Sequence, residues 1–277
     1  MPRTTTCLGV VAAAVFAVGC RTTRSSESGT VPATQAPGAA GGPVETPGAS
    51  DAGGGDEEAI AALPQGPRIG AGATHTCSLH PDGRVFCWGS NIFGALGDGT
   101  EIDRFSPVAV HGIDDAVLLA VDANGACARR AGGDVLCWGL VGPATGGTPQ
   151  PVPVAGLNGV VDLLLLYDAI CGLTPGGDVL CRTRSDDLAT GEATRVEGAA
   201  RAIELVGGGR NACVLRDDGT VLCWGDNAYG QLGDRTTNPS TAPLAVSGLS
   251  DTTALWSVGT TTWARRADGS VWVWGAD

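Results

Sequence analysis

The residues of this chain that could most readily do chemistry are its ten cysteines. Eight of them form four pairs whose members lie ten residues apart, with a glycine-containing turn between them. These pairs are Cys77/Cys87, Cys127/Cys137, Cys171/Cys181 and Cys213/Cys223. Paired thiols can form a disulfide, bind a metal ion or remain as buried core side chains. A fifth copy of the pattern carries Trp263 and Val273, so apolar packing can fill the same site.

A hairpin with a three-residue loop places residues ten apart directly opposite each other. The last loop position needs a positive φ, which glycine adopts at little cost, and it is glycine in all five copies: Gly83, Gly133, Gly177, Gly219 and Gly269. The cysteines then occupy a non-hydrogen-bonded pair, where the Cα atoms approach to about 4.5 Å, within reach of a disulfide. We therefore predict four disulfides, each inside one hairpin. Zinc ribbons space their paired ligands only two to four residues apart, so we expect no metal.

No other group of side chains has the pattern of a catalytic site. The three histidines, His75, His80 and His111, occupy different local settings and do not recur. Asp98 and Asp234 lie in glycine-rich loops that have neither the ligand spacing of a calcium loop nor the lysine of a phosphate loop. Turn formation explains these aspartates. We therefore expect no cofactor and predict that the protein is not an enzyme.

The first residues of the chain predict export. Arg3 precedes an apolar run from Cys7 to Val18, and small residues precede Cys20. This order is typical of a secretory signal, and the run is too short to span a membrane. A cysteine after small residues resembles the lipobox of bacterial lipoproteins, which implies a signal peptide at 1–19 and a lipid on Cys20. Arg21 then implies an outer-membrane or cell-surface location, and ordinary secretion is the alternative.

Residues 20–56 consist mainly of Gly, Ala, Ser, Thr and Pro, and predict a disordered tether. The remaining segment, 57–277, has the length of one all-β domain. The formal net charge is −12, and the only adjacent basic residues in this segment are Arg129-Arg130 and Arg265-Arg266. Nucleic-acid binding needs a positive surface, so we exclude it. We expect a monomer that contacts the membrane only through its lipid.

A second element recurs seventeen residues before each of the last four hairpins, as a valine followed by glycine two positions later: Val110, Val154, Val196 and Val246. The same offset from Cys77 leads to Ile60, so the first unit begins near Glu57. Apolar runs of strand length follow each element. In the second unit, the four strands expected are about 107–110, 117–122, 126–130 and 135–139. We predict an all-β fold, a β-propeller of about five four-stranded antiparallel blades. Its ring is either closed with five blades or left unclosed in a truncated product. The units are about 57–89, 107–139, 151–183, 193–225 and 243–275.

The connection between the hairpin and the next valine element varies in length. Trp88 precedes Val110 by twenty-two residues, whereas Arg182 precedes Val196 by fourteen. Variable loops on a rigid scaffold often carry binding residues. The candidate binding rim therefore comprises residues of the two long connections: Asn91, Ile92, Phe93, Asp98, Asn227, Tyr229, Gln231 and Asp234. The recurring tryptophans, Trp88, Trp138, Trp224 and Trp274, are expected to pack between blades.

The segments 87–100 and 223–234, which share Cys-Trp-Gly and Asn-x-x-Gly-x-Leu-Gly-Asp, resemble the repeat of the regulator-of-chromosome-condensation family. The cysteine pairs are similar to those of its secreted bacterial members. The resemblance covers about residue 57 to the end and implies a β-propeller. Two departures stand out: the family's best-known propeller has seven blades, and the second and third units lack the long motif, with Arg182 in place of the tryptophan.

The missing catalytic pattern, the signal-like start and the variable loops together predict a non-catalytic propeller outside the cytoplasmic membrane that binds through the variable-loop rim. The family includes secreted bacterial propellers that inhibit an extracellular enzyme, so the resemblance implies a protein partner. A carbohydrate- or envelope-glycan-binding module is the main alternative. A hydrolase, or nucleotide exchange as in the eukaryotic founder of the family, is a weaker one, since fold alone does not assign function.

Overall fold

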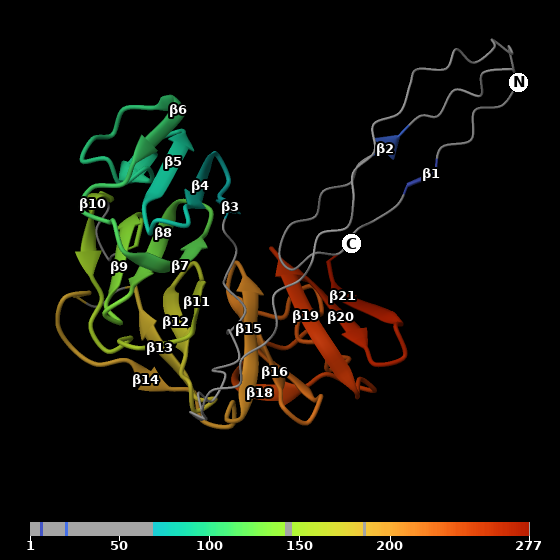
Figure 1. Ribbon diagram of the computed structural model, residues 1–277. Coiled ribbons are helices and arrows are strands. Elements are labelled where there is room, and N and C mark those ends of the chain that lie inside the picture. The colour runs from blue at the N-terminus through green and yellow to red at the C-terminus, as the bar shows by residue number, and fades with distance from the viewer. Residues whose placement is uncertain (1–5, 8–19, 22–68, 142–145, 185–186, 277) are drawn as a thin grey trace, which may run out of the picture. The chain divides into compact units, whose positions relative to one another are not determined.

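The computed structural model describes residues 6–7, 20–21, 69–141, 146–184 and 187–276 (Figure 1). The first of two compact units (Met1–Ala12 with Phe16–Ala62) is described only at β1 (Thr6–Cys7) and β2 (Cys20–Arg21), which pair antiparallel. The predicted signal peptide and tether otherwise lie outside the described residues, as does Ile60, and they remain predictions. Within the described part of the chain, no helix has the length and apolar character needed to cross a membrane.

The second unit, which includes Leu63–Asp277, is all-β. Its strands form five antiparallel sheets, in each of which neighbours in sequence are neighbours in space. The first sheet holds β3 (Ile69–Ala71), β4 (His75–Leu79), β5 (Val85–Gly89) and β6 (Arg104–Ala109). The second holds β7 (Ala116–Val121), β8 (Gly125–Arg130), β9 (Val135–Gly139) and β10 (Thr148–Pro153). The third holds β11 (Asp162–Leu165), β12 (Ala169–Leu173), β13 (Val179–Thr183) and β14 (Thr194–Arg195).

The fourth sheet holds β15 (Ala202–Gly208), β16 (Asn211–Arg216), β17 (Val221–Gly225) and β18 (Ser240–Ala245). The fifth holds β19 (Thr252–Val258), β20 (Thr261–Arg266) and β21 (Val271–Gly275), so it has three strands among the described residues. A short 3₁₀ turn, η1 (Ile92–Gly94), lies between β5 and β6.

The central hairpin of every sheet has the predicted register. Cys77 lies opposite Cys87, and Trp263 lies opposite Val273 in the fifth sheet. The three-residue loop is confirmed in the first hairpin, where His80 N–H donates to the Arg84 carbonyl and Gly83 has φ of 83°. Disulfides join the four cysteine pairs, with Cα–Cα distances of 4.0 to 4.1 Å. Turn chemistry within a dozen residues is therefore enough to set these bonds.

One of the eight paired cysteines, Cys181, departs from the equivalence that the repeat predicts. It is bonded to Cys171 as expected, and the two lie opposite each other in the β12–β13 hairpin. The other seven cysteines of these pairs are fully buried, whereas Cys181 is only half-buried. Its outer neighbour β14 has two residues, whereas β6, β10 and β18 have six each. Because this outer strand is so short, it covers the third disulfide less completely than its counterparts cover theirs.

The grouping of strands into sheets differs from the sequence prediction in one respect. The strand expected to begin the second unit, about 107–110, instead pairs with β5 as the outer strand β6 of the first sheet. Val110 N–H then donates to the Val85 carbonyl at 2.9 Å, and Val246 N–H donates to the Val221 carbonyl at 3.0 Å in the fourth sheet. The valine element therefore ends one sheet and does not start the next.

Consecutive sheets pack through the first strand of each. Strand β7 lies against β3 and β4, β11 against β7 and β8, β15 against β11 and β12, and β19 against β15 and β16. Each core cluster accordingly combines residues of two neighbouring sheets, as Leu79 and Val85 combine with Leu119 and Trp138. Among the described residues no comparable packing joins the fifth sheet to the first, so the ring is not closed. Val273 is 61% exposed, whereas the equivalent Cys223 is fully buried.

Candidate functional site

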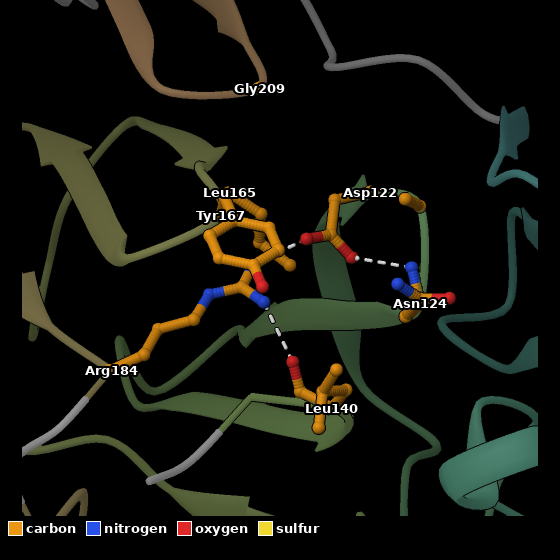
Figure 2. Close-up of a pocket in the computed structure, with 8 residues that line it drawn as sticks. Asp122, Asn124, Leu140, Leu165, Tyr167, Arg184 and Gly209 are labelled. Atoms are coloured by element: carbon orange, nitrogen blue, oxygen red, sulfur yellow. Dashed lines mark hydrogen bonds and ion pairs between the residues drawn. The ribbon is translucent and has the colours of Figure 1, made fainter. Parts of the chain in front are cut away.

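A hollow of about 270 Å³ lies where the loops that end β7, β11 and β15 approach one another. Figure 2 shows its polar side, where Arg184 reaches between Asp122 and Leu140. The Arg184 guanidinium donates to the Asp122 carboxylate at 2.5 Å and to the Leu140 carbonyl at 2.6 Å. The other oxygen of Asp122 accepts the Gly125 and Asn124 N–H groups at 2.7 and 3.1 Å. Because both carboxylate oxygens are occupied, we interpret this largely buried pair as a joint between the second and third sheets.

One aromatic ring at this hollow is open to solvent. Tyr167 is 61% exposed, and the Arg210 guanidinium lies over its ring at 4.5 Å. Tyr167 N–H donates to the Gly209 carbonyl, so the third and fourth sheets also meet here. Sequence reasoning did not single out Tyr167, Arg184 or Asp122, because no spacing within one repeat brings them together.

A second cavity, of about 400 Å³, is lined at the ends of the first strands of all five sheets: Ala71, Val121, Leu165, Gly208 and Val258. Burial raises the pKa of Asp162, whose carboxylate accepts the Leu163 and Leu205 N–H groups, to about 6. Burial also raises the pKa of Glu204, which accepts the Leu255 N–H at 2.8 Å. Each carboxylate thus binds a backbone N–H of the next sheet. Among the described residues no cluster of three or more His, Cys, Asp or Glu side chains could hold a metal ion.

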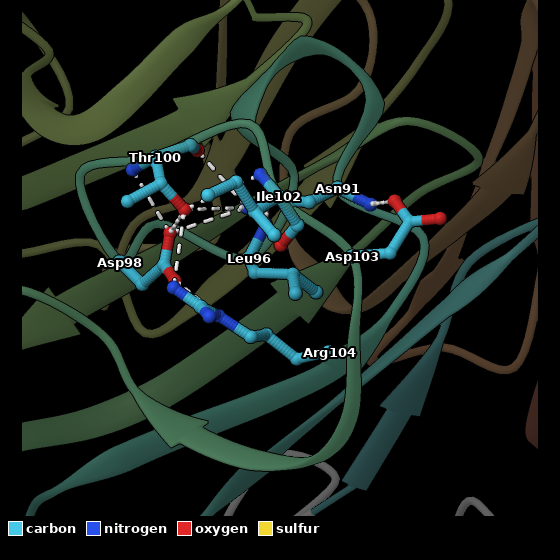
Figure 3. A network of polar contacts seen from close by, with 7 residues as sticks. All are labelled: Asn91, Leu96, Asp98, Thr100, Ile102, Asp103 and Arg104. Carbon is cyan, nitrogen blue, oxygen red and sulfur yellow. Dashed lines mark hydrogen bonds and ion pairs between the residues drawn. The ribbon is translucent and has the colours of Figure 1, made fainter.

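The loop from β5 to β6 is organised by one buried amide. Asn91 is fully buried, and its Nδ2 donates to the Thr100 and Ile102 carbonyls at 2.9 and 3.1 Å and to the Asp98 carboxylate at 3.2 Å. Its Oδ1 accepts the Leu96 N–H at 2.9 Å. Figure 3 shows these contacts converging on Asn91 from both halves of the loop. A single side chain therefore fixes the loop from inside.

Asp98 completes this network. Although burial favours its neutral form, hydrogen bonds from Thr100, Arg104 and Asn91 lower the pKa of the Asp98 carboxyl below its ordinary value. Arg104 forms an ion pair with Asp98 at 2.9 Å (Figure 3). The charge of Arg104 is thereby compensated inside the loop.

The loop from β17 to β18 repeats this arrangement. Asn227 Nδ2 donates to the Thr236 and Asn238 carbonyls at 3.1 and 2.9 Å and to Asp234 at 3.1 Å. Its Oδ1 accepts the Leu232 N–H at 2.9 Å, as Asn91 does for Leu96. The two long connections are thus two copies of one hydrogen-bonded structure.

Each long loop is attached to the next sheet by a recurring tryptophan. Trp138 Nε1 donates to the Ala95 carbonyl at 3.1 Å, and Trp274 Nε1 donates to the Gln231 carbonyl at 3.0 Å. Arg182, which replaces the tryptophan in the third sheet, is buried and donates to the carbonyls of Ala155, Asp187 and Thr190. These side chains hold the loops in place.

The eight residues expected to form the binding rim divide into two groups. Asn91, Asn227 and Gln231 are at least 98% buried, and Asp98 and Asp234 accept hydrogen bonds inside the loops, so we assign these five side chains to the loop scaffold and do not propose them as contact residues. Their polar character reflects the loop's own hydrogen bonds. Ile92 and Tyr229 are 59% and 64% exposed, and Phe93 is half-buried with φ of 63°. These three remain predicted contact residues.

Two further exposed apolar side chains, one in the same loop and one at the start of β6, were missed from the sequence. Ile102 is 61% exposed and Phe105 is fully exposed. The bond from Asn91 to the Ile102 carbonyl brings residues 91 and 92 beside residue 102. Aligning the two long connections would have found both side chains, since Asn238 and Thr241 take their places in the fourth sheet.

Comparison with known proteins agrees with the fold. Two models described as the Regulator of chromosome condensation (RCC1) repeat match this chain, one at residues 68–95 and 203–231 and the other at 82–122 and 218–259. The RCC1 domain-containing protein RUG3, mitochondrial, of Arabidopsis thaliana is 26% identical over 235 residues, which cover 75% of this chain and 53% of that protein. The ultraviolet-B receptor UVR8 of the same plant is 39% identical over 57 residues, 21% of this chain and 13% of the receptor.

Solved structures show the same architecture. Prp20p of Saccharomyces cerevisiae superimposes with a TM-score of 0.61 at 22% identity, over 75% of this chain and 56% of that one. Human WBSCR16 gives a TM-score of 0.61 at 18% identity, over 75% of this chain and 61% of that one. The chain spans only about half the length of such relatives. Residues 68–122 and 203–259 thus match the regulator of chromosome condensation (RCC1) repeat, and the described sheets have the fold of an RCC1-like β-propeller that does not close.

Proposed function

We propose that this protein is a non-catalytic β-propeller lipoprotein that binds another protein through one rim. That rim consists of the loops that follow the third strand of the sheets. The observation that carries the proposal is that two of these loops expose a large apolar side chain, Ile92 or Tyr229, from a backbone fixed by internal hydrogen bonds. A pre-ordered loop loses little conformational entropy on binding, which favours affinity.

Likeness to proteins with protein partners supports this choice. The structure of yeast Prp20p is described with its binding properties to Gsp1p and histones, and Kap60 has been crystallised bound to the same protein. Those partners belong to Prp20p. For this chain we infer only the class of ligand, a protein, and we assign no enzymatic step.

Export and anchoring form the second half of the proposal. Four disulfides are typical of proteins that fold in an oxidising compartment. We infer that residues 1–19 are removed, that Cys20 carries lipid, and that residues 20–56 tether the domain of residues 57–277 to the outer membrane or cell surface. Metabolic lipid labelling of the full chain should be lost in Cys20→Ala. An unlabelled parent protein would remove the anchor.

The binding proposal is tested by cross-linking the full chain in its own cells and purifying it. We expect one protein to be retained in stoichiometric amount. The double variant Ile92→Ala/Tyr229→Ala should lose it. Ala131→Ser, an exposed change in a hairpin turn at the opposite end of the strands, should keep it. Recovery of no protein, or of polysaccharide alone, would overturn the proposal.

A further inference from the structure

The β5–β6 loop and the β17–β18 loop share one scaffold but differ in the side chains they expose. Ile92, Ile102 and Phe105 are 59%, 61% and 100% exposed in the first. The same positions of the fourth sheet hold small or polar residues, all exposed: Ala228, Asn238 and Thr241. Comparison of the two loops therefore shows which side chains the shared hydrogen-bonded structure requires.

The hydrogen bonds of the central amide are the same in the two loops within a few tenths of an ångström. In the β5–β6 loop (the first loop), the Asn91 amide donates to the Thr100 and Ile102 carbonyls at 2.9 and 3.1 Å. In the β17–β18 loop of the fourth sheet (the fourth loop), the Asn227 amide donates to the Thr236 and Asn238 carbonyls at 3.1 and 2.9 Å. The bonds from Asn91 N–H to Asp103 and from Arg104 to Asp98 belong to the first loop alone, because Pro239 and Ser240 take those places in the other. Because Ala228, Asn238 and Thr241 support this network equally well, Ile92, Ile102 and Phe105 are not required for folding. Single exposed apolar residues are ordinary on protein surfaces, but two on one fixed loop and a third at the start of the adjoining strand β6 mark a contact surface.

The charge around these side chains indicates what kind of surface they meet. Glu101 and Asp103 are exposed on either side of Ile102, whereas Thr237 and Pro239 take these places in the fourth loop. The adjacent cation, Arg104, is already paired with Asp98. Asp103 accepts the Asn91 N–H at 2.7 Å, but among the described residues no cation forms an ion pair with Glu101 or Asp103. The apolar side chains are therefore bordered by net negative charge.

We propose that Ile92, Ile102 and Phe105 form a docking surface for a protein segment that is apolar on one side and basic at its border. This inference rests on the proposed protein-binding function and assigns it to the first loop. Apolar contact supplies most of the affinity at such a surface, and the carboxylates select the orientation and the sign of the partner.

The test uses the full chain and two synthetic helical peptides, one of leucine and lysine and one of leucine and glutamate, with binding followed by fluorescence anisotropy. The variant Ile92→Ala/Ile102→Asn/Phe105→Thr copies the fourth loop and leaves the net charge unchanged. Any loss of affinity therefore reports the apolar contact and not general attraction to an acidic protein. A second variant, Glu101→Thr, removes one border charge.

We expect the leucine–lysine peptide to bind the parent roughly tenfold or more tightly than the triple variant, and Glu101→Thr to weaken binding by a smaller factor. The leucine–glutamate peptide should bind the parent more weakly than its basic counterpart. Equal affinity of parent and triple variant for the leucine–lysine peptide would overturn the inference. If cross-linking still retains a cellular protein in that case, the proposed function stands and only its assignment to the first loop fails.

The triple variant should keep the parent's thermal unfolding midpoint, because each new residue already occupies the same position in the fourth loop. A variant that is folded and disulfide-bonded yet still binds the basic peptide as the parent does would equally contradict the inference.

Discussion

Relative to the parent, the Asp162→Asn variant should gain stability as the pH rises from acid to neutral. Asp162 lines the cavity of about 400 Å³, and burial raises the pKa of its carboxyl from 3.8 to about 6. A pKa that is higher in the folded than in the unfolded chain means that folding disfavours the charged form. The gap, about 2 pH units at about 1.4 kcal/mol each, corresponds to roughly 3 kcal/mol of folding free energy lost when the carboxyl ionises.

The sign of the effect fixes the pH window. Below about pH 4, Asp162 is neutral in both the folded and the unfolded chain, and its full contribution to the free energy of unfolding is present. As the pH rises through about 6, the folded protein must bury a charge and that contribution is lost. Asparagine has a similar shape, stays neutral and keeps an oxygen for the Leu163 N–H, which Asp162 accepts at 2.8 Å, whereas its NH2 group cannot accept the Leu205 N–H. The stability of the variant relative to the parent should therefore rise by up to about 3 kcal/mol between pH 4 and pH 7.5.

The assay is urea unfolding of parent and variant from pH 4 to pH 8, with the disulfides intact. Asp134→Asn, an exposed change of equal charge in the second hairpin, is the matched control and should follow the parent. Glu204, whose pKa burial also raises, is present in all three proteins, but its charge also raises the pKa of Asp162, so relief of that repulsion is part of the difference measured for the Asp162 variant. A difference in the free energy of unfolding between variant and parent that does not change with pH, or that falls as the pH rises, would refute the reasoning.

Two further predictions concern the scaffold. Replacing Cys127 and Cys137 by valine removes one disulfide, and valine already fills the equivalent place at Val273. The free energy of unfolding should fall by about 3 kcal/mol at most, because the bond closes a short loop. Urea unfolding that is unchanged from the parent would contradict a role for the bond in stability. Asn91→Ala should lower the free energy of unfolding by about 2–3 kcal/mol, because it leaves the buried Leu96 N–H without its acceptor, and Asn227→Ala should have the same effect. Limited proteolysis of each variant should cut the affected loop first. Unchanged protection of that loop from the protease would count against the network.

The hairpins were predictable because their geometry is local. A glycine at the third loop position sets the register, and the register places each cysteine opposite its partner. The strands around Leu119 and Leu205 were equally visible as short apolar runs. In each case the information lies within about a dozen residues. The partial exposure of Cys181 was not predictable in this way, because it depends on how far the outer strand β14 extends.

The outer strands were assigned to the wrong sheet because their partner is set by distant backbone groups. Nothing in residues 107–110 distinguishes a strand that ends one sheet from a strand that begins the next. The bond from Val110 N–H to the Val85 carbonyl decides the question, and only the folded chain forms it.

The candidate rim combined scaffold residues with exposed residues for a related reason. Asparagine and aspartate in a glycine-rich loop suggest an exposed polar surface, yet the side-chain amide of Asn91 donates and accepts its hydrogen bonds within the loop. Ile102 and Phe105 lie outside the repeat motif, so motif-based reasoning passed over them. Comparison between repeats is the signal that separates scaffold residues from those the scaffold does not need.

The most direct measurement of the central claim is photo-cross-linking in the cells that make this protein. A photoreactive phenylalanine analogue replaces Phe105 in one full-length chain and Thr241, its counterpart in the fourth loop, in another. The account predicts a discrete protein adduct from position 105 and little or none from position 241, although both are exposed. The absence of a protein adduct from both positions would contradict protein binding through this rim. Equal adducts from the two positions, or an adduct from position 241 alone, would contradict the assignment of the contact to the β5–β6 loop.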